Sequence, residues 1–233
     1  MILKTKLFGH VYEFKSVCEV MAKANEEKSG DKLAGIAAET AEERVAAKVV
    51  LSHLTLNDLR NSPAVPYEED EVTRIIQDAV NETIFNEFKN MTVAEFREWL
   101  LDERTTTEMI RHASRGLTSE IVAGVCKLMS NLDLIYAAKK MRVSAHCNTT
   151  IGLPGTFSSR LQPNHTTDDP KGIIASVMEG LSLGCGDAVI GLNPVDDSLE
   201  SVARILKMFD EFKRKWEIPT QICVLAHVTT QME

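Results

Sequence analysis

The stretch NTTIGLPGTFSSRLQPN, from Asn148 to Asn164, marks the position at which the pattern of the chain changes. Before it, apolar residues recur every three or four positions, which is typical of amphipathic helices. Within it, Thr149 to Gly152 predicts a short buried strand. Pro154 and Gly155 then break the pattern, and a polar loop carrying Arg160 and Gln162 follows. We expect the functional side chains to begin in this loop.

After the stretch, strands and helices are predicted to alternate. Helical patterns run from about 170 to 183 and onward from Leu199, and apolar runs at 188–192 and 222–228 predict strands. These runs are continuously apolar, which is typical of a parallel sheet covered on both faces. The spacing between strand starts is close to that of a TIM barrel, in which eight units occupy about 250 residues.

The predicted fold class is therefore α/β. We expect a mainly helical N-terminal domain over residues 1–142, with a short β-hairpin at 2–14. Residues 143–233 are expected to form the first three βα units of a TIM-type (β/α)8 barrel, truncated after the third strand. Capping boxes such as Thr40 with Glu43 and Thr92 with Glu95 support the helical part. One longer helix is predicted from Asp70 to Phe88, with Val72 and Ile75 on its buried side.

Composition excludes several classes of protein. A formal charge of -8 argues against a general nucleic-acid binder. We find no run of 18 apolar residues and no apolar signal sequence, so we expect no membrane span. The five cysteines are scattered and contain no C-x-x-C pair, which favours a reducing cytosol. Most of the cysteines lie in apolar patterns and are predicted to be buried, unreactive thiols.

The candidate site is selected by the rule that ligands bind at the carboxyl ends of parallel strands. If residues 160–162 are extended, the side chains of Arg160 and Gln162 lie on one side of the strand and Leu161 on the other. Asn193 follows the second strand and could add a third polar group. The alternatives are that Arg160 pairs with Asp168 or Asp169, and that Asn193 is a turn residue before a proline. From pattern alone, the ion-pair alternative and ligand binding have about equal weight.

His146 and His227 offer a metal-site alternative. Neither has a second histidine or a carboxylate at the spacing typical of metal ligands, so we expect no metal site. An isolated histidine more often has a structural role, with its hydrogen bonds made within the protein, than a role as a metal ligand.

Several longer motifs carry a family resemblance. They are TTIGLPGTFSSRLQPN, GLSLGCGDAVIGLNPV and IPTQICVLAHVTTQ in the second half, and LKTKLFGHVYEFK, AKANEEKSGDKLAG, TRIIQDAVNET and DLIYAAKKM in the first. Together they resemble the large subunit of ethanolamine ammonia-lyase, in the same order and over the whole chain. This resemblance implies a helical domain followed by a TIM barrel.

The resemblance also implies an activity. Enzymes of that family are adenosylcobalamin-dependent radical lyases that convert ethanolamine to acetaldehyde and ammonia, with the coenzyme between the large and small subunits. By resemblance, Arg160 and Asn193 contact the substrate hydroxyl, and Gln162 helps to hold the amino group. Arg160 is the catalytic candidate, and Asn193 and Pro194 are the cofactor-binding candidates. The family further implies a homo-oligomer of large subunits and a cytoplasmic location, with enclosure in a bacterial microcompartment as a further expectation.

One element of such a site is missing from the sequence. An ammonium substrate beside Arg160 needs an anion, and we expect its carboxylates to come from barrel strands beyond the half of a large subunit that is matched. Two other hypotheses remain open: a metal-dependent TIM-barrel hydrolase using His146 and His227, and a non-catalytic assembly module. Metal analysis tests the first, and size measurement with a cobalamin titration tests the second.

Overall fold

The computed structural model describes residues 3–146 and 149–233, and the chain divides into two compact units at Arg142 and Val143. Asn148, the first residue of the stretch at which the pattern changes, and Cys147 lie outside the described residues. Among the described residues, no helix is long and apolar enough to cross a membrane.

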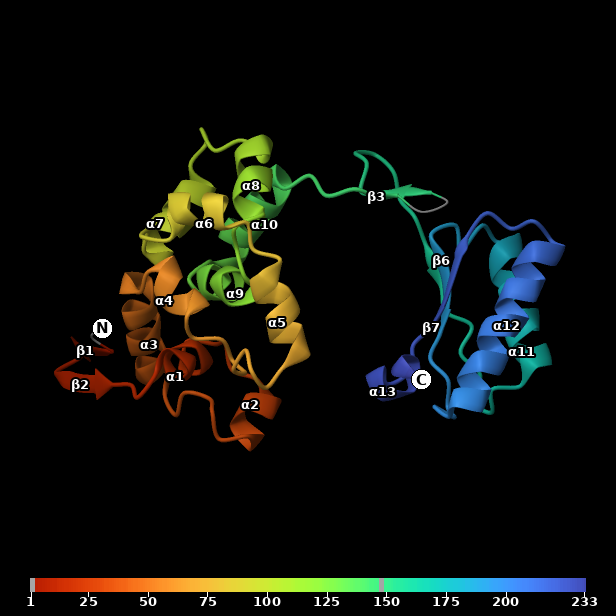
Figure 1. The fold of residues 1–233 in the computed structure, drawn as a ribbon, viewed down its shortest axis with the longest axis horizontal. Coiled ribbons are helices and arrows are strands. Elements are labelled where there is room, and N and C mark those ends of the chain that lie inside the picture. The colour runs from red at the N-terminus through yellow and green to blue at the C-terminus, as the bar shows by residue number, and fades with distance from the viewer. Residues whose placement is uncertain (1–2, 147–148) are drawn as a thin grey trace. The chain divides into compact units, whose positions relative to one another are not determined.

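The first unit is helical, with the predicted hairpin at its start (Figure 1). The strands β1 (Lys4–Leu7) and β2 (His10–Glu13) pair antiparallel. The turn between them uses positive φ at Phe8 and Gly9, which matches the twist of the two strands. The helices that follow are α1 (Val17–Lys23), α2 (Ser29–Leu33), α3 (Ala41–His53), α4 (Leu56–Arg60), α5 (Glu71–Asp78), α6 (Glu82–Phe88), α7 (Val93–Leu101), α8 (Thr107–Ser114), α9 (Ser119–Lys127) and α10 (Asn131–Lys140).

Helix caps and one apolar core explain why this unit folds as it does. The Thr40 and Thr92 side chains accept the N–H of the residue three positions later, as the capping motifs predict. The core residues come mainly from α1, α3, α4, α7 and α9 and include the fully buried Val20, Ala46, Leu51, Leu56, Leu59, Val93 and Ile121.

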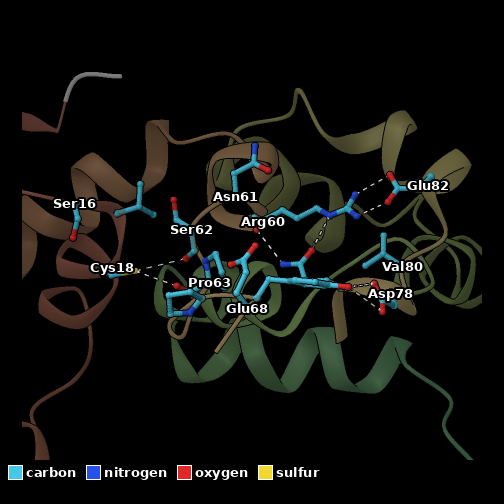
Figure 2. Close-up of a pocket in the computed structure, with 14 residues that line it drawn as sticks. Ser16, Cys18, Arg60, Asn61, Ser62, Pro63, Glu68, Asp78, Val80 and Glu82 are labelled. Carbon is cyan, nitrogen blue, oxygen red and sulfur yellow. Dashed lines mark hydrogen bonds and ion pairs between the residues drawn. The ribbon is translucent and has the colours of Figure 1, made fainter. Parts of the chain in front are cut away.

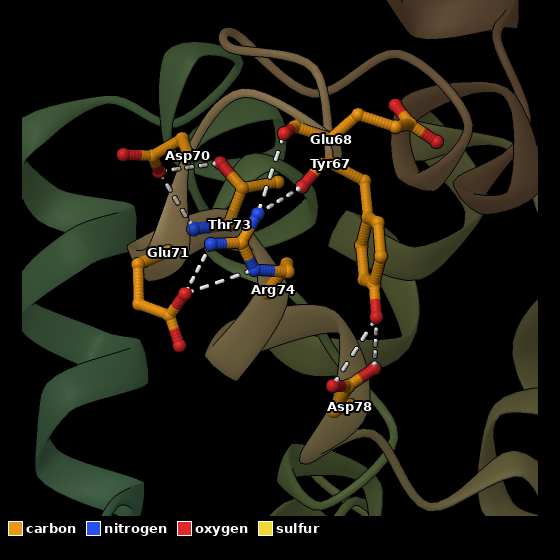
Figure 3. Close-up of polar contacts among 7 residues, drawn as sticks. All are labelled: Tyr67, Glu68, Asp70, Glu71, Thr73, Arg74 and Asp78. Atoms are coloured by element: carbon orange, nitrogen blue, oxygen red, sulfur yellow. Dashed lines mark hydrogen bonds and ion pairs between the residues drawn. The ribbon is translucent and has the colours of Figure 1, made fainter.

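The prediction of a single helix from Asp70 to Phe88 is wrong. The chain forms α5 and α6, because the Asn81 side chain caps a new helix by accepting the N–H of Ile84. Helix α5 then buries Thr73, while Val72 and Ile75 are each 61% exposed. The Asp70 carboxylate caps α5 through Thr73, and Arg74 pairs with Glu71 (Figure 3).

The prediction of mostly buried cysteines is also wrong. Cys18, Cys126 and Cys185 are exposed, and Cys223 is partly buried. The reason in α1 and α9 is that neighbouring apolar residues occupy the core-facing positions instead.

The second unit contains a three-stranded parallel sheet in the order β5-β6-β7, formed by β5 (Arg160–Leu161), β6 (Val189–Leu192) and β7 (Gln221–Val224). Helices α11 (Pro170–Ser182) and α12 (Leu199–Lys215) lie on the same face of the sheet (Figure 1). Phe209 of α12, Val177 of α11 and Ile190 of β6 meet in a common core. A short helix, α13 (Val228–Met232), follows β7.

The first strand of this sheet is not the predicted one. Thr150 and Ile151 form β4 (Thr150–Ile151), which pairs antiparallel with β3 (Ala145–His146) in a separate hairpin. Ile151 is 38% exposed, whereas Leu161 packs against the core beneath α11 and α12. Arg160 therefore lies within a strand of the sheet, not in a loop that follows one. The described residues form three parallel strands and no closed barrel.

Candidate functional site

The open face of the parallel sheet brings the predicted polar residues together. Leu161, Ile190 and Ile222 are aligned across the strands and point into the core with α11 and α12. Since side chains alternate along a strand, Arg160 and Gln162 lie on the opposite face. Both are exposed, as the alternation predicts. Asn193 comes two positions after Gly191 and is also exposed, so by the same period it belongs to this face.

The Arg160 side chain packs against the backbone of Gly191. A Cβ atom at Gly191 would be 2.7 Å from Nη2 of Arg160 and 3.0 Å from its Cζ. The same Cβ would be 2.8 Å from Sγ of Cys223 in the neighbouring strand. The guanidinium therefore crosses from β5 over the bare backbone of β6, and a glycine is needed for this close approach.

The three candidate side chains have no protein partners within residues 3–146 and 149–233. The Arg160 guanidinium makes no hydrogen bond or ion pair with those residues, and the carboxamides of Gln162 and Asn193 make no hydrogen bond with them. The two carboxylates considered as alternatives are engaged elsewhere. Asp169 caps α11 through the N–H of Gly172 at 2.7 Å, and Asp168 binds the loop after β6. The cation and both amides are thus available to a ligand.

Side chains from the loop after β5 fix the loop after β6. The Asn164 side-chain oxygen accepts the N–H of Asn193 at 2.9 Å. One oxygen of the Asp168 carboxylate accepts the N–H groups of Val195 at 2.8 Å and Asp196 at 2.9 Å. Pro194 has no N–H, so every backbone donor from Asn193 to Asp196 is bound by these two side chains. The local sequence around Asn164 and Asp168 does not indicate this role.

The other end of β5 is anchored by Asp187. Its carboxylate accepts both the backbone N–H and the hydroxyl of Ser159, each at 2.7 Å. These two bonds, the backbone one first, hold the pKa of Asp187 below its usual value. A two-residue strand is thereby fixed at both ends, which gives Arg160 a defined starting point on the sheet.

Asp168 supports a stability prediction. The residue is 2% exposed, and its second oxygen is buried without a partner among the described residues. Asp168→Ala leaves two backbone N–H groups without an acceptor and should lower the free energy of unfolding by about 1–3 kcal/mol. Asp168→Asn retains an acceptor and tolerates the left-handed φ of 50°, so it should lose less. Urea unfolding and amide exchange at Val195 and Asp196 measure this, and unchanged exchange in Asp168→Ala would contradict the proposed anchor.

The two histidines have structural partners. The Nδ1 atom of His146 is 2.7 Å from the Thr150 hydroxyl across the β3–β4 hairpin. The Nδ1 atom of His227 is 2.8 Å from the Thr229 hydroxyl at the start of α13. In the part of the chain that the structure describes, no three His, Cys, Asp or Glu side chains are grouped so that they could hold a metal ion.

The helical unit contains a cavity of about 1060 Å³ that has a different character (Figure 2). Arg60 lines it, but its guanidinium binds the carboxylate of Glu82 and the side chain of Gln77. The same group stacks 4.4 Å from the ring centre of Phe85. Tyr67 also lines the cavity, and its hydroxyl donates to Asp78 (Figure 3). Because its cation is already neutralised, we do not regard this cavity as the candidate site.

Comparison with known proteins identifies the family. Residues 12–233 match the family described as ethanolamine ammonia lyase large subunit (EutB). The chain is 58% identical, over all 233 residues, to the ethanolamine ammonia-lyase large subunit of Escherichia coli (strain K12), covering 51% of that protein. The large subunit of Salmonella typhimurium (strain LT2) gives the same identity and coverage. The chain spans about half the length of these curated relatives, and it belongs to the ethanolamine ammonia-lyase large subunit family.

Proposed function

We propose that these residues form the substrate-orienting part of an ethanolamine ammonia-lyase large subunit. The observation that carries the proposal is the placement of Arg160, Gln162 and Asn193. All three are on the open face of the sheet: Gln162 and Asn193 follow the last residues of β5 and β6, and Arg160 begins β5 with its guanidinium over Gly191 of β6. Their side chains bind nothing else among the described residues. The family match over residues 12–233 supports the same reading.

The proposed fold of the second unit is the start of a (β/α)8 barrel. Two features support it. The strands follow one another in sequence order across the sheet, and α11 and α12 cover one face only. In a barrel the helices form an outer ring, so the other face would become the interior. Arg160 and Gly191 would then face the barrel interior.

The proposed roles follow from the chemistry of each group. Arg160 supplies a planar fork of donors that suits the hydroxyl oxygen of ethanolamine. Asn193 can donate to the same oxygen, and the Gln162 carbonyl oxygen can accept from the substrate ammonium. Neither amide neutralises the ammonium charge, and no carboxylate lies at ion-pair distance from Arg160 among the described residues. The proposal therefore requires an acidic ligand supplied by another part of the enzyme.

The cofactor proposal concerns Asn193 and Pro194. Asn193 presents an exposed carboxamide, and the adjoining Val195 presents apolar surface at 66% exposure. Hydrogen-bonding capacity next to apolar surface suits an adenosyl group, so these residues fit the family's cofactor, adenosylcobalamin. When bound, adenosylcobalamin supplies the radical chemistry, and the residues described here bind and orient the substrate. The proposed partners are a small subunit and further copies of the large subunit.

A chimeric large subunit tests the proposed function. It joins residues 1–233 of this chain to the remaining half of the E. coli relative and is co-expressed with the E. coli small subunit. We expect it to release acetaldehyde from ethanolamine when adenosylcobalamin is added. A chimera that assembles and binds the coenzyme but releases no acetaldehyde would refute the proposal. The 233-residue chain with the small subunit and coenzyme should show no turnover, because no carboxylate lies at ion-pair distance from Arg160 in the part of the chain that the structure describes.

A further inference from the structure

A second cavity in the helical unit, of about 850 Å³, gathers lysines from separate segments. Lys28 precedes α2, Lys48 lies on α3, and Lys127 ends α9. Asn25 and Asn131 add side-chain amides to the same wall. We call these five residues the lysine pocket. The whole chain carries a charge of -8, so this local excess of cations is opposite to the average of the molecule.

The positive charge of the lysine pocket is only partly neutralised. Lys48 pairs with Glu26 at 2.6 Å, and the Glu26 side chain is itself 71% exposed. Lys127 donates to the side-chain oxygen of Asn25 at 3.0 Å, which supplies no charge. In the described part of the chain, no carboxylate lies within ion-pair distance of Lys28 or Lys127. The Asp31 carboxylate lies one step further away, where it accepts from the Asn25 amide at 2.8 Å. Three ammonium groups therefore share two carboxylates, which leaves an excess of about one positive charge.

Burial makes this excess unfavourable. Lys127 is partly buried, and that burial, followed by the nearby charge of Lys28, lowers the pKa of its ammonium group. Asp31 opposes this shift in the pKa of Lys127, and Lys48 adds to it. A bound anion would offset the repulsion among the three ammonium groups and strengthen their hydrogen bonds.

Part of the remaining cavity wall is apolar, beside Glu26 and Ser130. Leu128, Met129 and Leu134 line it beside the lysines, so the cavity offers both cations and a hydrophobic surface. A phosphate monoester carries about -1.5 to -2 charge at pH 7 and three acceptor oxygens, so a single group can accept from all three ammonium groups, whereas a carboxylate has only two oxygens. We propose that the lysine pocket binds a small organic phosphate, with its phosphate at Lys28, Lys48 and Lys127 and its body against Leu128, Met129 and Leu134. This proposal is independent of the proposed lyase function.

Titration of the purified 233-residue chain with phenyl phosphate tests the site, by calorimetry or by the ³¹P signal of the ligand. We expect saturable binding that weakens about tenfold in Lys127→Gln and in Lys28→Gln, since each loses one charged hydrogen bond. Lys28 is exposed, so its variant should fold even if Lys127→Gln does not. Lys213→Gln, at the end of α12, is the matched control and should bind like wild type. The pKa of Lys127, followed through its ε-carbon signal, should rise when the ligand saturates.

Each outcome is decisive. Absence of saturable binding, or equal weakening by Lys28→Gln and Lys213→Gln, would overturn the site. Inorganic phosphate, titrated in parallel, tests the apolar wall and should bind more weakly than phenyl phosphate. Equal affinity for the two probes would overturn the assignment of an organic ligand.

Discussion

Replacing Arg160 by alanine in the chimeric large subunit is expected to lower kcat by a factor on the order of 10²–10³. That range is typical when one preorganised donor to a developing charge is removed. As the amine departs, negative charge develops at the substrate oxygen, and the Arg160 fork is the proposed donor to it. Within β5, β6 and β7, Arg160 is the only lysine or arginine. Steady-state acetaldehyde release measures the effect.

Comparison of variants separates this role from a general effect of charge. Gln162→Ala should lower kcat less, since Gln162 is proposed to contact the ammonium end of the substrate. Arg160→Lys retains the charge but loses the planar fork, so it should recover only part of the activity. Arg204→Ala, on the exposed side of α12, is the matched control and should leave kcat unchanged. Wild-type turnover in Arg160→Ala would exclude the proposed role.

The sequence pattern predicts those elements whose hydrophobic faces are long enough to be unambiguous. Helices α11 and α12 and strand β6 lie where the apolar periods indicate, because each buries several side chains in one core. The first parallel strand is different. Arg160 and Leu161 pair over only two positions, and one apolar residue carries the contact with the helices. Ile151 lies in a more apolar run, yet it pairs with Ala145 in a local hairpin. Local hydrophobicity therefore cannot show which of the two segments, 150–151 or 160–161, joins the parallel sheet.

The sequence pattern predicts only part of the candidate site as well. The alternation of Arg160 and Gln162 is a property of the chain itself and could be predicted. The anchoring of Val195 by Asp168 joins residues 27 positions apart, and nothing near Asp168 in the sequence indicates that partner. Gly191 did leave a signal, since a glycine inside an apolar strand often marks a close approach of another group. Which group approaches it depends on the register of β5 against β6.

That close approach leads to the second large prediction. Gly191→Ala places a Cβ atom 2.7 Å from Nη2 of Arg160 and 2.8 Å from Sγ of Cys223, so one of them must move. The backbone of β6 is held by the buried side chains of Ile190 and Leu192 on its other face. The flexible end of Arg160 should therefore move instead. A displacement of about 1 Å in a positioned group can cost on the order of 10² in rate.

Stability should change little in the same variant. A glycine in a strand costs roughly 0.5–1 kcal/mol relative to alanine, so the substitution offsets part of the crowding it introduces. The expected result for Gly191→Ala is a fall in kcat of about 10²-fold with a melting temperature close to wild type. Adding Cys223→Ala removes one of the two crowded contacts and should restore part of the activity, because the guanidinium gains space in which to settle.

Gly180→Ala, in helix α11, provides the matched control, because it faces the side of β5 opposite to Gly191. Its Cβ atom would crowd the side chain of Leu161, which packs in the core beneath α11. This variant should lower the melting temperature while the folded enzyme keeps its kcat, the reverse of the pattern for Gly191→Ala. Loss of activity in parallel with loss of stability in both variants would mean that Gly191 serves only packing. If Gly191→Ala lowers only kcat and Gly180→Ala lowers only the melting temperature, Gly191 sets the position of the Arg160 guanidinium. The two variants can be compared in this way because the two glycines lie against opposite faces of β5.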